Sequence, residues 1–155
     1  MDTQQQFLTS LSTLLDKITL LSKEQLATEL KGYKPAEVHT IEYIGQHPQA
    51  NVTQIATALF VTRGAVSKLT KRLMTRGLIE RYQQSDNRKE IYFNLTPRGQ
   101  EVFDIHARLH QGFQQRDQPV FDQADPAQLQ ATLDFLKQYN DHLDAEITKQ
   151  GLNGH

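Results

Sequence analysis

Apolar side chains recur at intervals of three and four residues over two long segments, one near each end of the chain. This spacing places them on one face of a helix and predicts amphipathic helices over about residues 4–30 and 126–149, with a shorter helix from Pro35 to Gly45. The apolar positions of the two long helices are Phe7, Leu8, Leu11, Leu14, Leu15, Ile18, Leu21, Leu129, Leu133, Leu136, Leu143 and Ile147. Each apolar face needs a partner, either in the same chain or in a second copy of it.

The middle of the chain contains two short helices joined by a tight turn. Apolar spacing predicts the first over residues 52–59, followed by a break at Phe60 and Val61. Thr62 suits the N-cap of the second helix, and Gly77 suits the position just after its end. On this second helix Val66, Leu69 and Leu73 are expected to face inward. Two helices in this arrangement are typical of a helix-turn-helix.

After Gly77 the apolar period changes from helical to two. The stretches LIERY and EIYFNL alternate apolar and polar residues and flank the charged loop QQSDNRK, which predicts a hairpin with a basic tip. Thr96 and Pro97 then suit the start of another helix, expected to run to about Gln115. Pro119 and the stretch DQADPAQ are expected to mark the break before the last helix. The expected fold is mainly α with a small β-hairpin wing. It is a winged helix-turn-helix, with helices at the N- and C-terminal ends that could dimerise.

Basic residues are concentrated in one segment, although the whole chain has a formal net charge of only −1. From Phe60 to Arg98 there are nine Lys and Arg side chains and three Asp and Glu side chains, a net charge of +6. The rest of the chain is correspondingly acidic. A basic block of this kind predicts a surface that binds a polyanion such as nucleic acid.

Seven residues are candidates for contact with nucleic acid, six of them on or beside the exposed face of the second short helix. They are Thr62, Arg63, Ser67, Lys68, Lys71, Arg72 and Arg88. Most such contacts go to phosphate, but Arg can also form a bidentate pair with guanine. We therefore expect Arg63, near the helix N-terminus, to read bases. Arg88 at the hairpin tip is expected to enter the minor groove, where negative potential is concentrated. Asp86 is expected to pair with a basic neighbour and support the wing.

The ordered motifs of residues 52–99 resemble the MarR family of bacterial transcription regulators. The stretch VTQIATALFVTRGAVSKLTKRLMTRGLIERYQQSDNRKEIYFNLTPRG follows the family's order of scaffold helix, recognition helix, wing and LT-x-x-G. The wing carries the family's D-x-R pattern at Asp86 and Arg88. The resemblance implies a homodimer that binds double-stranded, pseudo-palindromic operator DNA, as a repressor whose affinity an effector modulates. It also implies a dimerisation region of residues 1–34 and 116–155, and a DNA-binding domain of residues 35–115 that includes the long helix after the wing.

His106 and His110 lie one helical turn apart, a spacing that allows both side chains to bind one ion. A zinc-sensing branch of the MarR family has histidines at the positions matching His39, His106 and His110, with a carboxylate from the first helix. The resemblance implies that Glu24 would supply this carboxylate here. The second metal site of that branch uses a cysteine, which this chain lacks.

The carboxylate and the role of the histidines both leave alternatives. Glu29 or Glu37 could replace Glu24, because the first loop differs in length from that branch. The fatty-acid-synthesis repressors of the same family also share the E-x-H-T-I and H-x-x-x-H stretches, and they respond to acylated carrier protein. The three histidines can therefore indicate a zinc site, an organic effector site or a buried polar cluster. No cofactor is expected to be required for folding.

Other functional classes have less support in the sequence. The chain has no cysteine, no phosphate-binding glycine loop and no HExxH motif, so we expect no enzymatic activity. A winged helix that binds a protein instead of DNA is an alternative, which the basic segment disfavours. No stretch is long and apolar enough to span a membrane, and the first residues lack the pattern of a secretory signal. We therefore expect a cytoplasmic protein.

Overall fold

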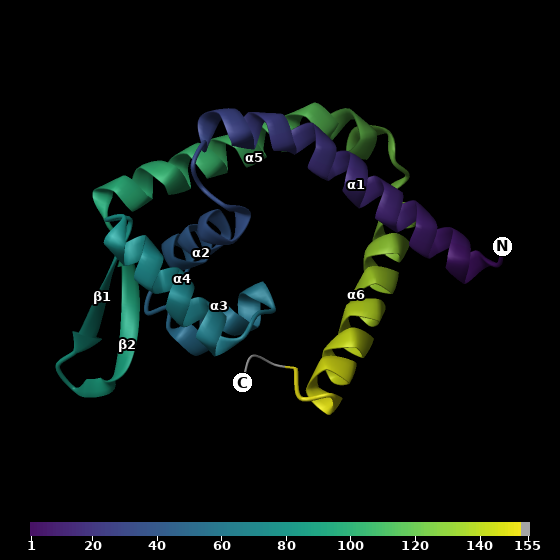
Figure 1. Ribbon diagram of the computed structural model, residues 1–155. Coiled ribbons are helices and arrows are strands. Elements are labelled where there is room, and N and C mark those ends of the chain that lie inside the picture. Colours follow the sequence, from purple (N-terminus) through teal and green to yellow (C-terminus); the bar gives the residue numbers. More distant parts are fainter. Residues whose placement is uncertain (153–155) are drawn as a thin grey trace.

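The structure is a computed structural model that describes residues 1–152, in which six helices and one two-stranded hairpin follow one another (Figure 1). The elements are α1 (Thr3–Glu29), α2 (Pro35–Gln46), α3 (Val52–Leu59), α4 (Arg63–Thr75), β1 (Ile79–Gln84), β2 (Asn87–Leu95), α5 (Pro97–Gln123) and α6 (Pro126–Lys149). The last three residues of the expected dimerisation segment 116–155 lie outside the described residues. Among the described helices, none has the length and hydropathy needed to span a membrane.

The predicted helix-turn-helix is confirmed as α3 and α4. Asn51 caps α3 by accepting a hydrogen bond from the backbone N–H of Gln54 at 2.8 Å, and the Gln54 side-chain oxygen accepts one from the Asn51 N–H at 3.1 Å. The turn is made at Phe60, whose φ of 56° lies in the left-handed region. Thr62 then caps α4 as predicted, because its hydroxyl accepts from the Ala65 N–H at 3.1 Å. These local contacts determine where the two helices end and begin.

The hydrophobic core surrounds α2, which packs against α3, α4, β2 and the first half of α5. Ile41 of α2, Ile55 of α3 and Leu73 of α4 are completely buried. Val66 and Leu69 are buried as well, so the inward face predicted for α4 is confirmed. Since this face of α4 is held in the core, the opposite face is directed to solvent.

The wing is an antiparallel hairpin in which Ile79 pairs with Leu95 and Tyr82 pairs with Tyr92. An irregularity in the register follows Tyr82, next to the hairpin tip. The backbone N–H of Phe93 donates to the Ala50 carbonyl at 3.1 Å, which attaches β2 to the residues just before α3. The wing is therefore anchored at its base, while its tip extends away from the core (Figure 1).

Helix α5 is longer than predicted, because it continues through Pro119 to Gln123. The expected break at Pro119 is therefore wrong, whereas the break expected in DQADPAQ is confirmed, since α6 begins after the N-cap residue Asp125. A proline inside a helix leaves the carbonyl four residues earlier without its N–H partner. Here Pro119 is exposed near the end of the helix, where that carbonyl can bond to water. Helix α2 ends at Gln46, one residue later than the predicted end at Gly45.

Helices α1 and α6 have almost no core of their own. Within residues 1–152, no residue of either helix is buried. Phe7 of α1 contacts Phe135 of α6 edge to face, with ring centroids 5.2 Å apart. Figure 1 shows α1 lying along the second half of α5, and the C-terminal part of α6 lines a pocket together with α3.

We expect Gly99→Ala to destabilise the fold. An added Cβ would lie 1.9 Å from the carbonyl oxygen of Leu78, so backbone would have to move. The expected loss is about 2–3 kcal/mol of unfolding free energy, in the range measured for overpacked sites, and urea denaturation measures it. Gly112→Ala is the matched control in the same helix, because no atom lies within 4 Å of the added Cβ. That change should stabilise the protein by about 0.5–1 kcal/mol. Equal effects of the two substitutions would contradict the packing described for Gly99.

Candidate functional site

The exposed face of α4 brings together the basic residues predicted to contact nucleic acid. Arg63, Ser67, Lys68, Lys71 and Arg72 are all exposed, whereas the buried residues of the helix are Val66, Leu69, Thr70 and Leu73. The candidate set recurs at helical spacing, so the side chains share one side of the helix. This face can present hydrogen-bond donors and positive charge to the phosphates and base edges of a major groove. The hydroxyl of the remaining helix candidate, Thr62, already accepts the capping bond.

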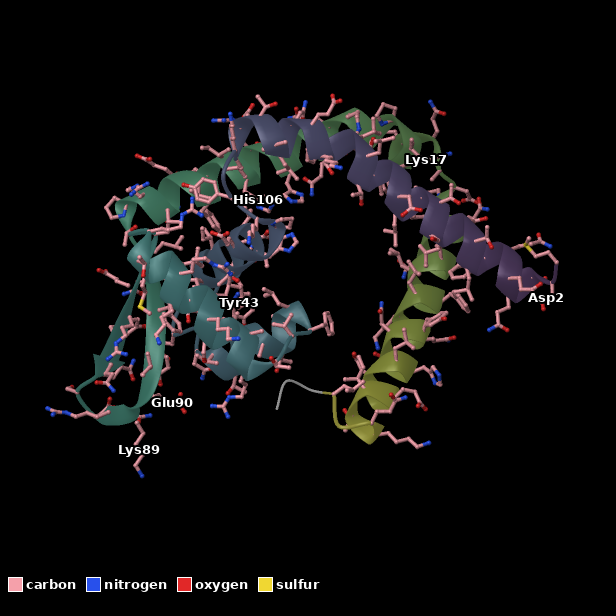
Figure 2. The ribbon with its side chains drawn as sticks, in the orientation of Figure 1. Asp2, Lys17, Tyr43, Lys89, Glu90 and His106 are labelled. Atoms are coloured by element: carbon pink, nitrogen blue, oxygen red, sulfur yellow. The ribbon has the colours of Figure 1, made fainter. Side chains whose placement is uncertain are left out.

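The wing tip carries Arg88 and Lys89, which are both exposed. Figure 2 shows the Lys89 side chain projecting away from the end of the hairpin. The expected support by Asp86 is not what holds the tip, since Asp86 makes no ion pair within residues 1–152. Instead, Asn87 accepts from the Lys89 N–H at 3.2 Å, and the Gln83 amide donates to the Arg88 carbonyl at 2.6 Å. Asp86 is exposed at the tip, where solvent removes the need for a charged partner.

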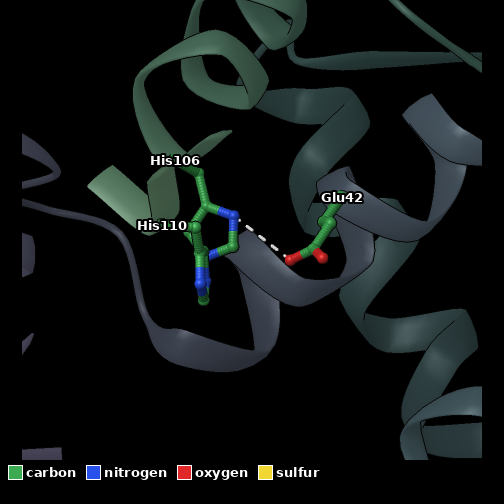
Figure 3. A group of neighbouring side chains, drawn as sticks. All are labelled: Glu42, His106 and His110. Carbon is green, nitrogen blue, oxygen red and sulfur yellow. Dashed lines mark hydrogen bonds and ion pairs between the residues drawn. The ribbon is translucent and has the colours of Figure 1, made fainter. Parts of the chain in front are cut away.

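A second cluster joins α2 to α5 and consists of Glu42, His106 and His110 (Figure 3). The Nδ1 atom of His106 lies 3.1 Å from a carboxylate oxygen of Glu42. On the other side of the same ring, the Nε2 atoms of His106 and His110 lie 3.0 Å apart. The three side chains therefore form a continuous chain of polar contacts, with His106 in the middle.

Burial disfavours the charged form of His106. The residue is 4% exposed, and this desolvation is the main reason that its pKa lies below the usual value of 6.5. The charges of His110 and His39 lower the pKa further, while the Glu42 carboxylate opposes them. A neutral imidazole has one nitrogen free to accept a hydrogen bond or bind a metal. Because Glu42 accepts from Nδ1, the free nitrogen is Nε2, which faces His110.

The structure brings together only part of the predicted metal set. The His39 ring is exposed on α2, with its centroid 6.4 Å from that of His106. Glu24 is exposed on α1 and does not belong to the cluster, so the carboxylate comes from Glu42 instead. Sequence reasoning missed Glu42, although one local indication was present. It lies three residues after His39, which places both on one side of α2.

The two substitutes considered for Glu24 are engaged elsewhere. Glu29 pairs with Arg108 at 2.9 Å on the surface between α1 and α5. Glu37 is buried and pairs with Arg76 of the α4 end. Neither carboxylate is available to the histidine cluster.

An apolar cavity of about 270 Å³ lies directly beside the histidine cluster. It opens between α1 and the start of α2, and its polar lining includes His39 and His106 as well as Thr19, Ser22 and Lys23 of α1. Its apolar walls include Leu26, Leu30 and Val38. This combination suits an organic molecule with an apolar body and a polar or anionic group.

A winged helix-turn-helix with a basic recognition face defines a class of nucleic-acid-binding proteins, and comparison with known sequences identifies the family. The sequence model of the MarR family matches residues 34–91. The HTH-type transcriptional regulator PchR of Bacillus subtilis (strain 168) is 35% identical over 111 residues, which cover 72% of this chain and 66% of that protein. The uncharacterised HTH-type transcriptional regulator YhjH of the same organism is 38% identical over 86 residues, 56% of this chain and 49% of that protein. The chain belongs to the MarR family. It spans about half to two thirds of the length of these curated relatives.

Solved structures show the same fold. FabT of Streptococcus pneumoniae, crystallised in complex with DNA, superimposes with a TM-score of 0.78 at 22% identity, covering 92% of this chain and 98% of that chain. The adhesin competence repressor AdcR of Streptococcus pyogenes superimposes with a TM-score of 0.70 at 18% identity, covering 87% of this chain and 96% of that chain. The winged helix-turn-helix fold with its long flanking helices is therefore confirmed.

Proposed function

We propose that the chain is a homodimeric transcription regulator of the cytoplasm that binds pseudo-palindromic operator DNA as a repressor. The observation that carries the proposal is the basic, exposed face of α4, which the buried opposite face holds in a defined orientation. The relatives are transcriptional regulators and not enzymes, and FabT is a member of this fold that was crystallised with DNA. The protein-interaction alternative has no comparable support.

The dimer is supported by the apolar side chains that α1 and α6 leave in solvent. Leu14, Ile18 and Leu21 of α1 and Leu133 and Leu143 of α6 are all more than 40% exposed. Contiguous exposed apolar surface of this kind marks an interface. A two-fold dimer would cover it and would place two copies of α4 about one turn of DNA apart. We therefore retain residues 1–34 and 116–155 as the dimerisation region and residues 35–115 as the DNA-binding domain.

The effector site that we propose is the cluster of Glu42, His106 and His110, with zinc as its ligand. Two imidazole nitrogens bound to a tetrahedral zinc ion lie about 3.3 Å apart, from zinc–nitrogen bonds of about 2.0–2.1 Å. The observed 3.0 Å between the two Nε2 atoms is close to that separation. Glu42 would orient His106 through Nδ1, as carboxylates do behind metal-binding histidines. His39 borders the same region and is the nearest further ligand.

An organic effector is the second candidate, and the adjacent apolar cavity favours it. His106 borders both the cavity and the cluster, so an anionic group in the cavity could accept a hydrogen bond from a histidine. An acyl group or another apolar acid would fit this description. Either ligand would act by binding the DNA-competent and incompetent dimers with different affinities.

We expect Arg88→Ala to weaken binding to an operator duplex by about 1–2 kcal/mol, since it removes one wing contact with DNA. The duplex is enriched from a random library by the wild-type protein, and affinity is measured by fluorescence anisotropy at several salt concentrations. The wild-type affinity should fall steeply with salt, because phosphate contacts release counterions. Arg108→Ala is the matched control, because Arg108 is an exposed arginine of α5 that pairs with Glu29 and does not belong to the wing. An unchanged affinity of the Arg88 variant would contradict the role of the wing.

We expect one zinc ion to bind per subunit and the site to be lost when His106 and His110 are both changed to Ala. Titration calorimetry of the chelator-stripped protein measures this. Glu42→Gln should weaken zinc binding about 10–100-fold, as is typical for a group that orients a ligand. Glu24→Gln is the matched control and should leave the affinity unchanged. A wild-type protein that binds no zinc would overturn the metal proposal and favour the organic effector.

A further inference from the structure

A junction at the end of the recognition helix, formed by Tyr33, Glu37 and Arg76, links α4 to the chain between α1 and α2. We propose that this Arg76 junction positions the recognition helix for operator DNA, although none of its three residues contacts DNA. The proposal rests on the proposed function, because it concerns how α4 is presented to an operator.

The carboxylate of the junction is protected from solvent, whereas the Arg76 side chain is 33% exposed. The Glu37 side chain is 3% exposed, and its carboxylate accepts a hydrogen bond from the Arg76 guanidinium at 2.5 Å. The other oxygen of Glu37 lies 3.4 Å from the backbone N–H of Lys34, at the start of α2. A buried carboxylate requires a partner of this kind, since an unpaired charge in the interior is strongly unfavourable. The pair therefore constrains the distance between the start of α2 and the end of α4.

The aromatic ring of Tyr33 completes the junction. The Arg76 guanidinium carbon lies 4.4 Å from the centre of this ring, in cation–π contact. Tyr33 belongs to the link between α1 and α2, and it also lines the apolar cavity with His39 and His106. One guanidinium therefore contacts α2 and the link between α1 and α2 at the same time. A movement of Tyr33 in the cavity wall would therefore change its contact with Arg76 at the end of α4.

The same end of α4 is also attached to α5. The Thr96 hydroxyl donates to the Gly77 carbonyl at 2.6 Å, and the Arg98 guanidinium donates to the Arg76 carbonyl at 3.1 Å. Together with Glu37 and Tyr33, these contacts hold the C-terminal end of α4 against α2, the link before it and the start of α5. The proposed base-reading residue Arg63 is at the opposite end of the helix.

Because the junction and Arg63 lie at opposite ends of α4, a small tilt at the junction produces a larger displacement at Arg63. Helix α4 has 13 residues, and a helix of that length extends about 20 Å. A tilt of about 5° at the junction would therefore displace Arg63 by about 2 Å. Base contacts depend on hydrogen-bond geometry and would be lost by such a displacement, whereas general attraction to phosphates would remain.

Buried ion pairs contribute little net stability compared with apolar residues, but they can specify one arrangement. This favours a positioning role over a purely stabilising one. Because Arg76 is directed toward Glu37 and Tyr33, its removal should not change the number of phosphates that the protein neutralises. The junction and a direct DNA contact thus make different predictions for the salt dependence of binding.

The test compares Arg76→Gln, Glu37→Gln and the double variant with wild type, on the selected duplex and on a scrambled duplex. We expect each single variant to bind the selected duplex about tenfold more weakly and the scrambled duplex with unchanged affinity. The slope of affinity against salt should be unchanged, and sedimentation should show the wild-type assembly. The double variant should be no weaker than the weaker single variant, because both changes break one interaction.

Arg108→Gln is the matched control, since it breaks an Arg–Glu pair between α5 and α1 that is exposed, at 66% and 42% for the two side chains. It should bind both duplexes as wild type does. If the Gln variants fail to fold, Arg76→Lys and Tyr33→Leu test the same junction. Lys retains the charge next to Glu37 but lacks the planar guanidinium, and Leu removes the cation–π contact without exposing a charge. Both should reduce the preference for the selected duplex.

Three results would overturn the proposal. One is unchanged affinity for the selected duplex in folded junction variants. Another is a salt slope reduced by about one in Arg76→Gln, which would make Arg76 a phosphate contact. The third is an equal loss on both duplexes, which would indicate general destabilisation. A wild-type protein that does not prefer the selected duplex would instead refute the proposed function itself.

Discussion

The apolar faces of α1 and α6 impose the main constraint on this protein, because residues 1–152 of a single chain bury neither face. The two helices meet through Phe7 and Phe135, but most of their large apolar side chains remain in solvent. A second copy of the chain would provide the missing contact by symmetry. In that dimer, the distance between the two recognition helices would depend on how the terminal helices pair. The geometry of dimerisation would therefore determine which spacing of DNA half-sites the protein binds.

The connections between the dimerising helices and the DNA-binding unit are few and specific. Helix α5 runs continuously from the wing to the terminal helices, and the link after α1 leads directly into α2. The histidine cluster lies between α2 and α5, and the Arg76 junction lies between α2, α4 and the end of α1. A ligand at the cluster or in the adjacent cavity would therefore act where the two parts of the protein meet. This position suits control of DNA binding without direct competition for the DNA surface.

Features that depend on local sequence could be predicted, and features that depend on tertiary packing could not. The capping residue Thr62, the inward residues of α4 and the alternating strands of the wing all follow from short-range patterns, and the structure confirms them. The Glu37–Arg76 pair joins residues 39 positions apart, with no local pattern to indicate it. Glu42 replaces Glu24 in the cluster because the packing of α2 on α5 brings it to His106. Pro119 was misleading because an exposed helix end tolerates a missing hydrogen bond.

The central claim is that two copies of one basic helix read DNA at a spacing set by the dimer. Hydroxyl-radical footprinting of the protein on its selected duplex tests this most directly. We expect two protected segments on one face of the duplex, with centres about 10–10.5 base pairs apart, and one dimer bound per duplex. A single short protected segment with one subunit bound would exclude this arrangement, since the terminal helices would then have no part in DNA recognition.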